Sequence, residues 1–454
     1  MAGATDISEV IAPDETFASM TDEVSSIILR PHRRIGWWIG FGIGFALTVL
    51  LATALAALSA IGIGIWGDNI PVAWGFAIAN YIWWTDIATG GALISALFLL
   101  TRSEWRTAIH RIAETMMLFA TAAGGLMPIF HLGRYWYAYW LFPYTNVMGA
   151  WPQFRSPLHW DFVALIAFVA SIVLFWYIAL IPDLATLRDR ASGRIVRVLY
   201  GLFALGWQGS SRQWRHFRIT YWTFAGLMTA EVVAAHSVVG LDFAAGMTPG
   251  WHSTFLPPYF VIGAALTALA FILLLIIPVR WGYPLATMIT LRHVDVLAKL
   301  LLTSSLFMAY CYWIEAFMPF YGGVPADIWT INASFYGTYS FAYWGKIALN
   351  AILPQLLWFR PVRRCEPAVF AIALGVVIGM WLEYFLLIVG SLNRGYMSSR
   401  WFIYVPSFWD WATVAGTVGL FVAGLFLFLR FVPTLPMFEM RELIQRYRHK
   451  GDAA

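Results

Sequence analysis

Long apolar runs recur along almost the whole chain, and they constrain its fold more than any other feature. We place ten of them at about residues 36–61, 73–100, 112–130, 160–181, 219–240, 256–279, 298–317, 337–359, 367–390 and 409–429. Each is close to the roughly 20 residues that an α-helix needs to cross a bilayer. Because backbone groups in hydrocarbon must find partners within their own segment, each run is expected to be helical. The sequence therefore predicts an all-α polytopic membrane protein with ten transmembrane helices.

The composition excludes several other classes of protein. Hydrophobic residues make up 60% of the 454 positions and charged residues 12%, about half the roughly 25% that is usual in soluble domains. These values exclude a soluble globular enzyme and a disordered chain. Cys311 and Cys365 are too few for a disulfide framework and form no Cys-x-x-Cys motif. The polar, acidic first 30 or so residues predict no cleaved signal peptide.

The distribution of positive charge predicts the orientation in the membrane. Twenty-four of the 29 Lys and Arg residues fall in the two terminal segments or in the loops 101–111, 182–218, 280–299 and 360–366. The other loops hold Arg134, Arg155, Arg394 and Arg400, and Lys346 lies within an apolar run. Since Lys and Arg collect in cytoplasmic loops, both termini are expected in the cytoplasm. This divides the chain into a tail (1–35), a membrane domain (36–430) and a second tail (431–454).

Two smaller patterns concern packing and the membrane surface. Gly36, Gly40 and Gly44 recur at four-residue spacing. This either seats a second helix closely or reflects the general abundance of glycine in membrane helices. Residues 194–215 and 437–450 mix basic and apolar side chains, which predicts surface segments on the cytoplasmic side.

Ionisable residues within the apolar runs are candidates for function, because charge is costly in hydrocarbon. The set is Asp86, Glu231, His236, Glu315, Lys346 and Glu383. They are either ion pairs that fix helix packing or a relay that passes protons across the bilayer.

A second set of polar residues gathers at the predicted outer ends of several runs. His131 ends the third run, and Asp161 begins the fourth. His236 and Asp242 stand at the end of the fifth run, and His252 precedes the sixth. Arg394 lies in the last outer loop. A histidine, carboxylates and an orienting cation form an acid–base site if they converge. The alternative for each residue alone is a role in loop architecture.

An acid–base site at one membrane face suits a hydrophobic carrier of two protons and two electrons, such as a quinol. A transporter is the alternative, although such proteins usually show internal repeats and broken helices at the midplane. A haem b is disfavoured because paired histidines within the runs are lacking. A chain with no haem, flavin or iron–sulfur motif needs a partner protein to carry electrons away.

Several stretches make the sequence similar to a known family. They are Phe154–Asp161, Leu174–Arg190, Leu241–Ala244, Pro249–Tyr259, Pro354–Trp358 and Gly379–Tyr384. In these stretches the chain resembles the NrfD/polysulfide-reductase membrane-subunit family. Within that family it is most similar to the larger quinol-binding membrane subunit of alternative complex III. The similarity covers about residues 70 to 410.

The resemblance carries expectations for fold and function. It implies that the middle eight helices form two four-helix bundles and that the chain binds no haem, flavin or iron–sulfur cluster. It implies a menaquinol pocket at the periplasmic face, lined by His131, Asp161, Asp242 and Arg394. His131 and Asp161 would accept the hydroxyl protons, Asp242 would assist, and Arg394 would orient the ligand. The intramembrane set Asp86, Glu231, His236, Glu315, Lys346 and Glu383 would match a proton path.

The resemblance also implies partners and a location. Electrons would pass to a periplasmic iron–sulfur subunit related to molybdopterin oxidoreductases, then to multihaem c-type cytochromes. A second NrfD-like subunit and small membrane subunits would complete a complex in a bacterial cytoplasmic membrane. The alternative is a membrane anchor that exchanges electrons between quinone and a molybdenum-type reductase.

One position departs from the family pattern. Relatives carry a histidine in the second span, where this chain has Thr89, and Asp86 lies one helical turn earlier on the same face. Asp86 is therefore expected to replace that histidine, or else the proton path differs.

Overall fold

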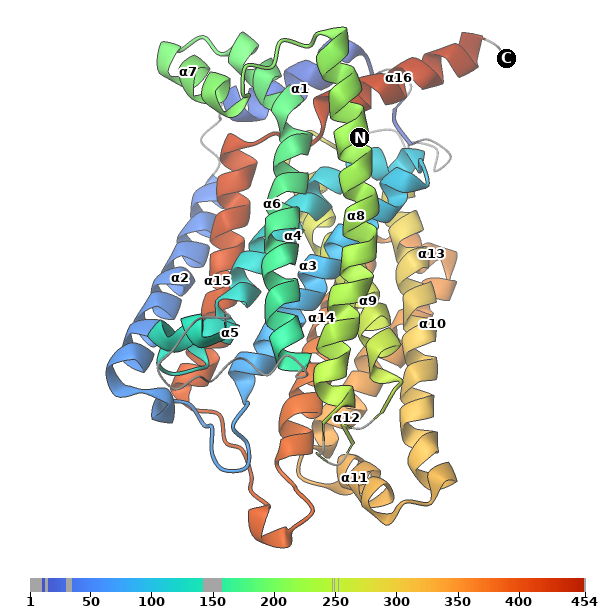
Figure 1. Ribbon diagram of the computed structural model, residues 1–454. Helices are drawn as coiled ribbons and strands as arrows, with labels where there is room; N and C mark the ends of the chain where they lie inside the picture. The colour runs from blue at the N-terminus through green and yellow to red at the C-terminus, as the bar shows by residue number, and fades with distance from the viewer. Residues whose placement is uncertain are drawn as a thin grey trace.

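The computed structural model describes residues 10–12, 15–29, 35–141, 157–246, 248, 250–251 and 253–452. Within these residues all regular structure is helical (Figure 1), and nine helical segments are long and apolar enough to cross a membrane. They are α2 (Ile35–Ile61), α3 (Phe76–Leu100), α4 with α5 (His110–Gly125, Met127–Phe130), α6 (Pro157–Arg190), α8 (Ser211–Ala244), α9 (Leu256–Gly282), α10 (Leu291–Gly322), α14 (Glu366–Phe385) and α15 (Phe408–Phe431). The prediction of an all-α polytopic membrane protein is confirmed.

The predicted run at 337–359 is helical but is not one continuous α-helix. It consists of α12 (Ser340–Lys346), a π-helical segment η4 (Ile347–Ile352) and a 3₁₀ segment η5 (Leu353–Trp358). Pro354 has no backbone N–H to donate to the carbonyl of Asn350, four residues earlier. The hydroxyl of Ser305 on α10 donates to that carbonyl instead, at 2.7 Å. The irregular turn is thus stabilised by a neighbouring helix.

The helices pack as two groups of four. In the first group α3, α4, α6 and α8 contact one another in a ring. In the second, α9, α10, the α12–η5 segment and α14 do the same. Contacts of α3 with α9 and α14, and of α8 with α9, join the two groups. Helix α3 packs against both groups and is almost entirely buried. This is the two-bundle arrangement that the family resemblance implies.

Helices α2 and α15 pack together beside the first group (Figure 1). A Cβ atom at Gly44 would lie 2.7 Å from the backbone nitrogen of Ala423, and one at Gly40 would overlap the ring of Phe426. Gly36 has nothing within 4 Å of such an atom. Of the two interpretations of this glycine spacing, close helix packing therefore holds at Gly40 and Gly44.

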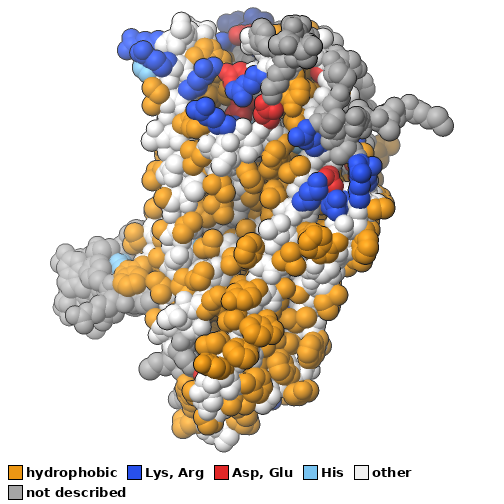
Figure 2. Space-filling model, turned by 90° about the vertical axis from the view of Figure 1, so that its right-hand side faces the viewer, with side chains coloured by type: hydrophobic (Ala, Val, Ile, Leu, Met, Phe, Trp, Pro, Cys, Tyr) orange, Lys and Arg blue, Asp and Glu red, His pale blue; other side chains and the backbone are white. Residues whose placement is uncertain are grey.

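The short elements define the two ends of the molecule. One end carries α1 (Phe17–Leu29), α7 (Arg194–Phe203) and α16 (Met437–Asp452), with η2 (Glu104–Ala108) close by, and we call it the basic end. The short helix α13 (Arg360–Arg364) lies lower in Figure 1, beside the part of α10 nearest to this end. The opposite end carries α5, η1 (Ile63–Ile65), η3 (Tyr135–Leu141), α11 (Pro325–Tyr336) and η7 (Ser398–Arg400). Figure 2 shows Lys and Arg side chains gathered toward the basic end, above a broad hydrophobic surface. Arg30, Arg33, Arg34 and Arg155 lie outside the described residues.

Part of the predicted N-terminal tail is folded onto the rest of the chain. Helix α1 buries Met20, Val24 and Ile28 and contacts α6, α15 and α16. The side chain of Arg190 on α6 donates to Asp22 of α1. The predicted surface segments at 194–215 and 437–450 contain α7 and α16, both at the basic end.

Candidate functional site

Asp161 and Asp242 lie close together near the end opposite to the basic end. Asp161 stands in the first turns of α6 and Asp242 in the last turn of α8, helices that contact each other along the first group. The hydroxyl of Tyr81 on α3 donates to Asp161 Oδ2 at 3.1 Å. The charges of Asp161 and Asp242 are near enough to repel, and Oδ1 of Asp242 is buried without a hydrogen-bond partner among the described residues. Two carboxylates and a phenol thus converge from three helices.

Deeper between the same helices, Asp86 and His236 form a fully buried pair. Nε2 of His236 is 2.8 Å from Asp86 Oδ1, and neither side chain is exposed. The hydroxyls of Thr267 on α9 and Tyr384 on α14 donate to the other carboxylate oxygen. The buried carboxylate of Asp86 is therefore held by side chains from three other helices, as an ionisable group within a membrane bundle requires.

Thr89 belongs to this network. Its hydroxyl lies 3.1 Å from Nε2 of His236. At the position where the family resemblance implies a histidine, the chain has a threonine that contacts a histidine supplied by α8. His236 therefore brings an imidazole into contact with both Thr89 and Asp86.

Lys346 is the centre of a second buried cluster, within the second group of helices. Its ammonium nitrogen is 3.0 Å from a carboxylate oxygen of Glu383 and 3.0 Å from one of Glu315. Tyr259 donates to Glu383 at 2.6 Å, and the ring centre of Tyr312 lies 4.7 Å from the ammonium. The side chains of Lys346 and Glu383 are 2% and 3% exposed, but that of Glu315 is 43% exposed.

Helix α14 links the two clusters. Glu383 binds Lys346, while the next residue, Tyr384, donates to Asp86. Gly263 of α9 leaves room for this contact, because a Cβ atom there would lie 3.0 Å from the Tyr384 hydroxyl and 3.5 Å from Asp86 Oδ2. Five of the six predicted intramembrane residues thus belong to two clusters, which meet at the consecutive residues Glu383 and Tyr384.

The other predicted residues have different surroundings. Oε2 of Glu231 on α8 is buried without a hydrogen-bond partner among the residues that the structure describes. His131 follows α5, and its Nδ1 is 2.8 Å from the carbonyl oxygen of Pro128. Burial lowers the pKa of His131. Because Nδ1 donates to that carbonyl oxygen, Nε2 is left to accept a proton.

Arg394 lies in an aromatic setting beyond α14. Its guanidinium is 5.4 Å from the ring centres of both Trp329 and Trp401, which stack on each other at 4.8 Å. The described contacts of His131 and Arg394 are therefore with their own surroundings rather than with Asp161 or Asp242. His252 lies outside the described residues.

Sequence reasoning missed a further buried polar network toward the basic end. Glu114 of α4 is fully buried and accepts hydrogen bonds from Tyr221 at 2.7 Å and Ser95 at 3.2 Å. One helical turn away, Arg111 pairs with Asp183 at 2.8 Å, both with no exposure. In the sequence Arg111 falls among the loop charges, and Glu114 stands at the edge of a predicted run. The sequence feature that could have identified them is the three-residue spacing of Arg111 and Glu114, which places a guanidinium and a carboxylate on one helix face.

Comparison with known proteins identifies the family. The pattern of the family described as "Polysulphide reductase, NrfD" matches residues 64–394, a range that contains every predicted site residue. The chain is 25% identical, over 75% of its own length and 76% of the relative's, to a putative dimethyl sulfoxide reductase membrane subunit of Halobacterium salinarum. It is 22% identical, over 83% of its length and 89% of the relative's, to a selenate reductase subunit of Mesobacillus selenatarsenatis. The family match covers well over half of the chain, and the chain therefore belongs to the polysulphide reductase NrfD family.

Proposed function

We propose that this chain is the quinone-interacting membrane subunit of a molybdenum-type oxidoreductase complex. The observation that carries the proposal is the convergence of Tyr81, Asp161 and Asp242 at one end of an apolar bundle. Oxidation of a quinol releases two protons, so its site needs proton acceptors beside an apolar slot. The two relatives named above are subunits of reductases, which consume electrons. Oxidation of a quinol, with menaquinol as our expected substrate, is therefore the direction that we propose.

The geometry supports the following roles, which we propose. Asp161 accepts a hydroxyl proton, and Tyr81 holds its carboxylate in place at 3.1 Å. Asp242 takes the second proton, a role supported by its nearness to the charge of Asp161. His131, with Nε2 able to accept, and Arg394, held by two tryptophans, belong to the same end and complete our proposed ligand site. Electrons leave through an iron–sulfur partner protein toward a molybdenum-containing catalytic subunit.

The test replaces the two carboxylates in the intact complex. Asp161→Asn and Asp242→Asn should each lower quinol:acceptor turnover by about 10²-fold, the usual size of a lost acid–base group. Asp189→Asn is the matched control, since Asp189 lies at the other end of α6 with its side chain 65% exposed. Turnover of both variants within twofold of the control would refute the assignment.

The second candidate function is quinol oxidation in an alternative complex III, with electrons passing to multihaem c-type cytochromes and a second NrfD-like subunit beside this chain. The stretches Leu174–Arg190 and Gly379–Tyr384 favour it, because the resemblance to that complex is carried there. Identification of the proteins that copurify with the chain separates the candidates. A large molybdenum protein without multihaem cytochromes supports the first, and multihaem cytochromes support the second.

Proton translocation is a separate part of the proposal. The Asp86–His236 and Lys346–Glu383–Glu315 clusters meet at Glu383 and Tyr384, so a proton relay has titratable groups in both bundles. We place both termini in the cytoplasm of a bacterial cell, with the quinol site at the periplasmic face. In proteoliposomes, Asp86→Asn should lower the number of protons moved per electron. An unchanged ratio would remove the relay from the proposal and leave the quinol site untouched.

A further inference from the structure

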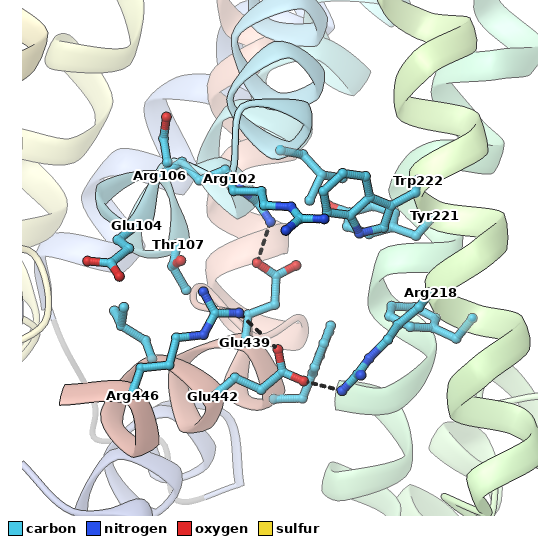
Figure 3. A pocket seen from close by; sticks show the side chains of 15 residues that line it. Arg102, Glu104, Arg106, Thr107, Arg218, Tyr221, Trp222, Glu439, Glu442 and Arg446 are labelled. Carbon is cyan, nitrogen blue, oxygen red and sulfur yellow. Dashed lines mark hydrogen bonds and ion pairs between the residues drawn. The ribbon is translucent and has the colours of Figure 1, made fainter. Parts of the chain in front are cut away.

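A cavity of about 440 Å³ opens at the basic end, between the α3–η2 turn, α8 and α16 (Figure 3). It lies far from the proposed quinol site. Arg218 at the cavity and Asp242 at that site are both on α8, so a rise of about 1.5 Å per residue separates them by roughly 36 Å. The cavity therefore needs its own explanation.

The cavity lining carries an excess of one positive charge. It contains four arginines, Arg102, Arg106, Arg218 and Arg446, and three glutamates, Glu104, Glu439 and Glu442. Glu439 pairs with Arg106 at 2.6 Å, and Glu442 pairs with Arg218 at 2.5 Å. A ligand that neutralises this lining carries one negative charge.

Two arginines have donors left for such a ligand. Arg106 is only 6% exposed, and its Nη1 atom is buried without a hydrogen-bond partner among the described residues. Arg102 follows α3 with a φ of 55°, in the left-handed region, and its guanidinium lies 5.2 Å from the ring centre of Trp222. This backbone conformation is uncommon for a residue other than glycine, and it is adopted here by an arginine that lines the cavity.

The position of the cavity indicates where the anion comes from. Acidic and basic side chains gather at the basic end, directly above the broad hydrophobic surface (Figure 2). The lining combines the arginines with apolar and aromatic side chains, among them Leu99, Trp222 and Leu443. Tryptophan and arginine together are typical of the level of lipid headgroups.

We propose that this cavity binds the headgroup of a phospholipid with a single negative charge. The phosphodiester matches the one excess positive charge and offers oxygens to Arg102 and to the unpaired Nη1 of Arg106. Ser103, Glu104 and Thr107 also line the cavity, and their side chains offer hydrogen bonds to the hydroxyl groups of a glycerol headgroup. A lipid held here ties α16 to α3 and α8, the three elements that form the cavity.

The experiment measures lipid retained by the intact complex in nanodiscs. One set contains phosphatidylcholine alone, and the other contains phosphatidylcholine with phosphatidylglycerol. Native mass spectrometry after delipidation should show one tightly held phosphatidylglycerol. Arg102→Gln and Arg218→Gln should each weaken its retention about fivefold, the effect of one basic residue near a membrane surface. Arg212→Gln, an exposed arginine on α8 outside the cavity, is the control.

Replacement of an acidic residue that lines the cavity provides a second test. Glu442→Gln frees Arg218 from its ion pair and should tighten retention, whereas a merely structural effect would weaken it. Displacement of the lipid by inorganic phosphate at millimolar concentration would overturn the assignment to a lipid and show a soluble-anion site. Equal retention in Arg102→Gln, Arg218→Gln and Arg212→Gln would overturn the site itself.

Discussion

His236 of α8 and Asp86 of α3 lie 2.8 Å apart, and neither side chain has any exposed surface. The two residues are 150 positions apart in the sequence. Their hydrogen bond joins α3 to α8 within the first group of helices. A buried pair of this kind adds little stability over apolar packing, but the loss of one partner leaves a polar group unpaired.

His236→Ala should therefore lower the free energy of unfolding by about 3 kcal/mol. The reason is that Asp86 would lose its imidazole partner and keep only the hydroxyls of Thr267 and Tyr384. Denaturant titration of the purified protein in micelles measures the change. Ser237→Ala, at the partly exposed neighbouring position, is the control and should change the value by less than about 0.5 kcal/mol. Equal effects of the two substitutions would contradict the prediction.

Gly263→Ala should break the contact that joins the two clusters. The added Cβ would lie 3.0 Å from the Tyr384 hydroxyl, so the tyrosine must move away from Asp86, at a cost of about 1 kcal/mol. Gly282→Ala on the same helix is the control, because nothing lies within 4 Å of its Cβ position. In a Tyr384→Phe background the obstructing hydroxyl is gone, and Gly263→Ala should become nearly neutral. A cost that persists in that background would show that the strain arises elsewhere.

Lys346→Met should be among the most destabilising single substitutions in the second bundle. It would leave the carboxylates of Glu383 and Glu315 without the ammonium between them, at a cost of about 3 kcal/mol. The double variant Lys346→Met/Glu383→Gln should recover part of this loss, since it removes the buried charge as well. Lys299→Met removes a 55% exposed lysine from its pair with Asp295, which keeps its hydrogen bond from Arg363 at 2.8 Å, and should cost less than about 1 kcal/mol. Additive effects in the double variant would argue against the cluster.

The membrane spans were predictable from sequence because a 20-residue apolar requirement is a local property. The break at 347–358 was not predicted, although Pro354 stands in the predicted run, and its stabilisation by Ser305 depends on a helix some 45 residues away. The two groups of four helices agree with the family resemblance. Apolar periodicity alone does not specify which helices contact each other.

The residues of the candidate site were predictable from their types, but which of them lie together was only partly predictable. Asp161 and Asp242 do converge, but Tyr81, a residue that carries no charge, was not recognisable as their partner. His236 stands near a run end and fits both polar sets in the sequence, whereas the structure places its hydrogen bonds with Asp86 and Thr89. Such assignments depend on helix rotation, to which a single sequence gives no access.

The loop before α3 provides a pH-dependent prediction. Burial, and then the nearby charge of Asp410, raise the pKa of Asp68 from 3.8 to about 7. The carboxylate of Asp410 accepts hydrogen bonds from the Tyr404 hydroxyl at 2.8 Å and from the backbone N–H of Gly67 at 2.8 Å. Between about pH 4 and pH 7 we therefore expect the folded protein to hold a proton on Asp68 that the unfolded chain has released.

Because the folded state binds the extra proton, the contribution of Asp68 to stability is complete below about pH 4 and is lost as the pH rises to about 7. Asp68→Asn stays neutral at every pH, so it should be more stable than the wild type at pH 8 and should lose less stability between pH 5 and pH 8. Thermal unfolding at a series of pH values measures both. Asp189→Asn, which replaces an exposed aspartate at the basic end, should follow the wild type. Parallel curves for Asp68→Asn and the wild type would show that the Asp68 carboxyl is already ionised in the folded protein at pH 5.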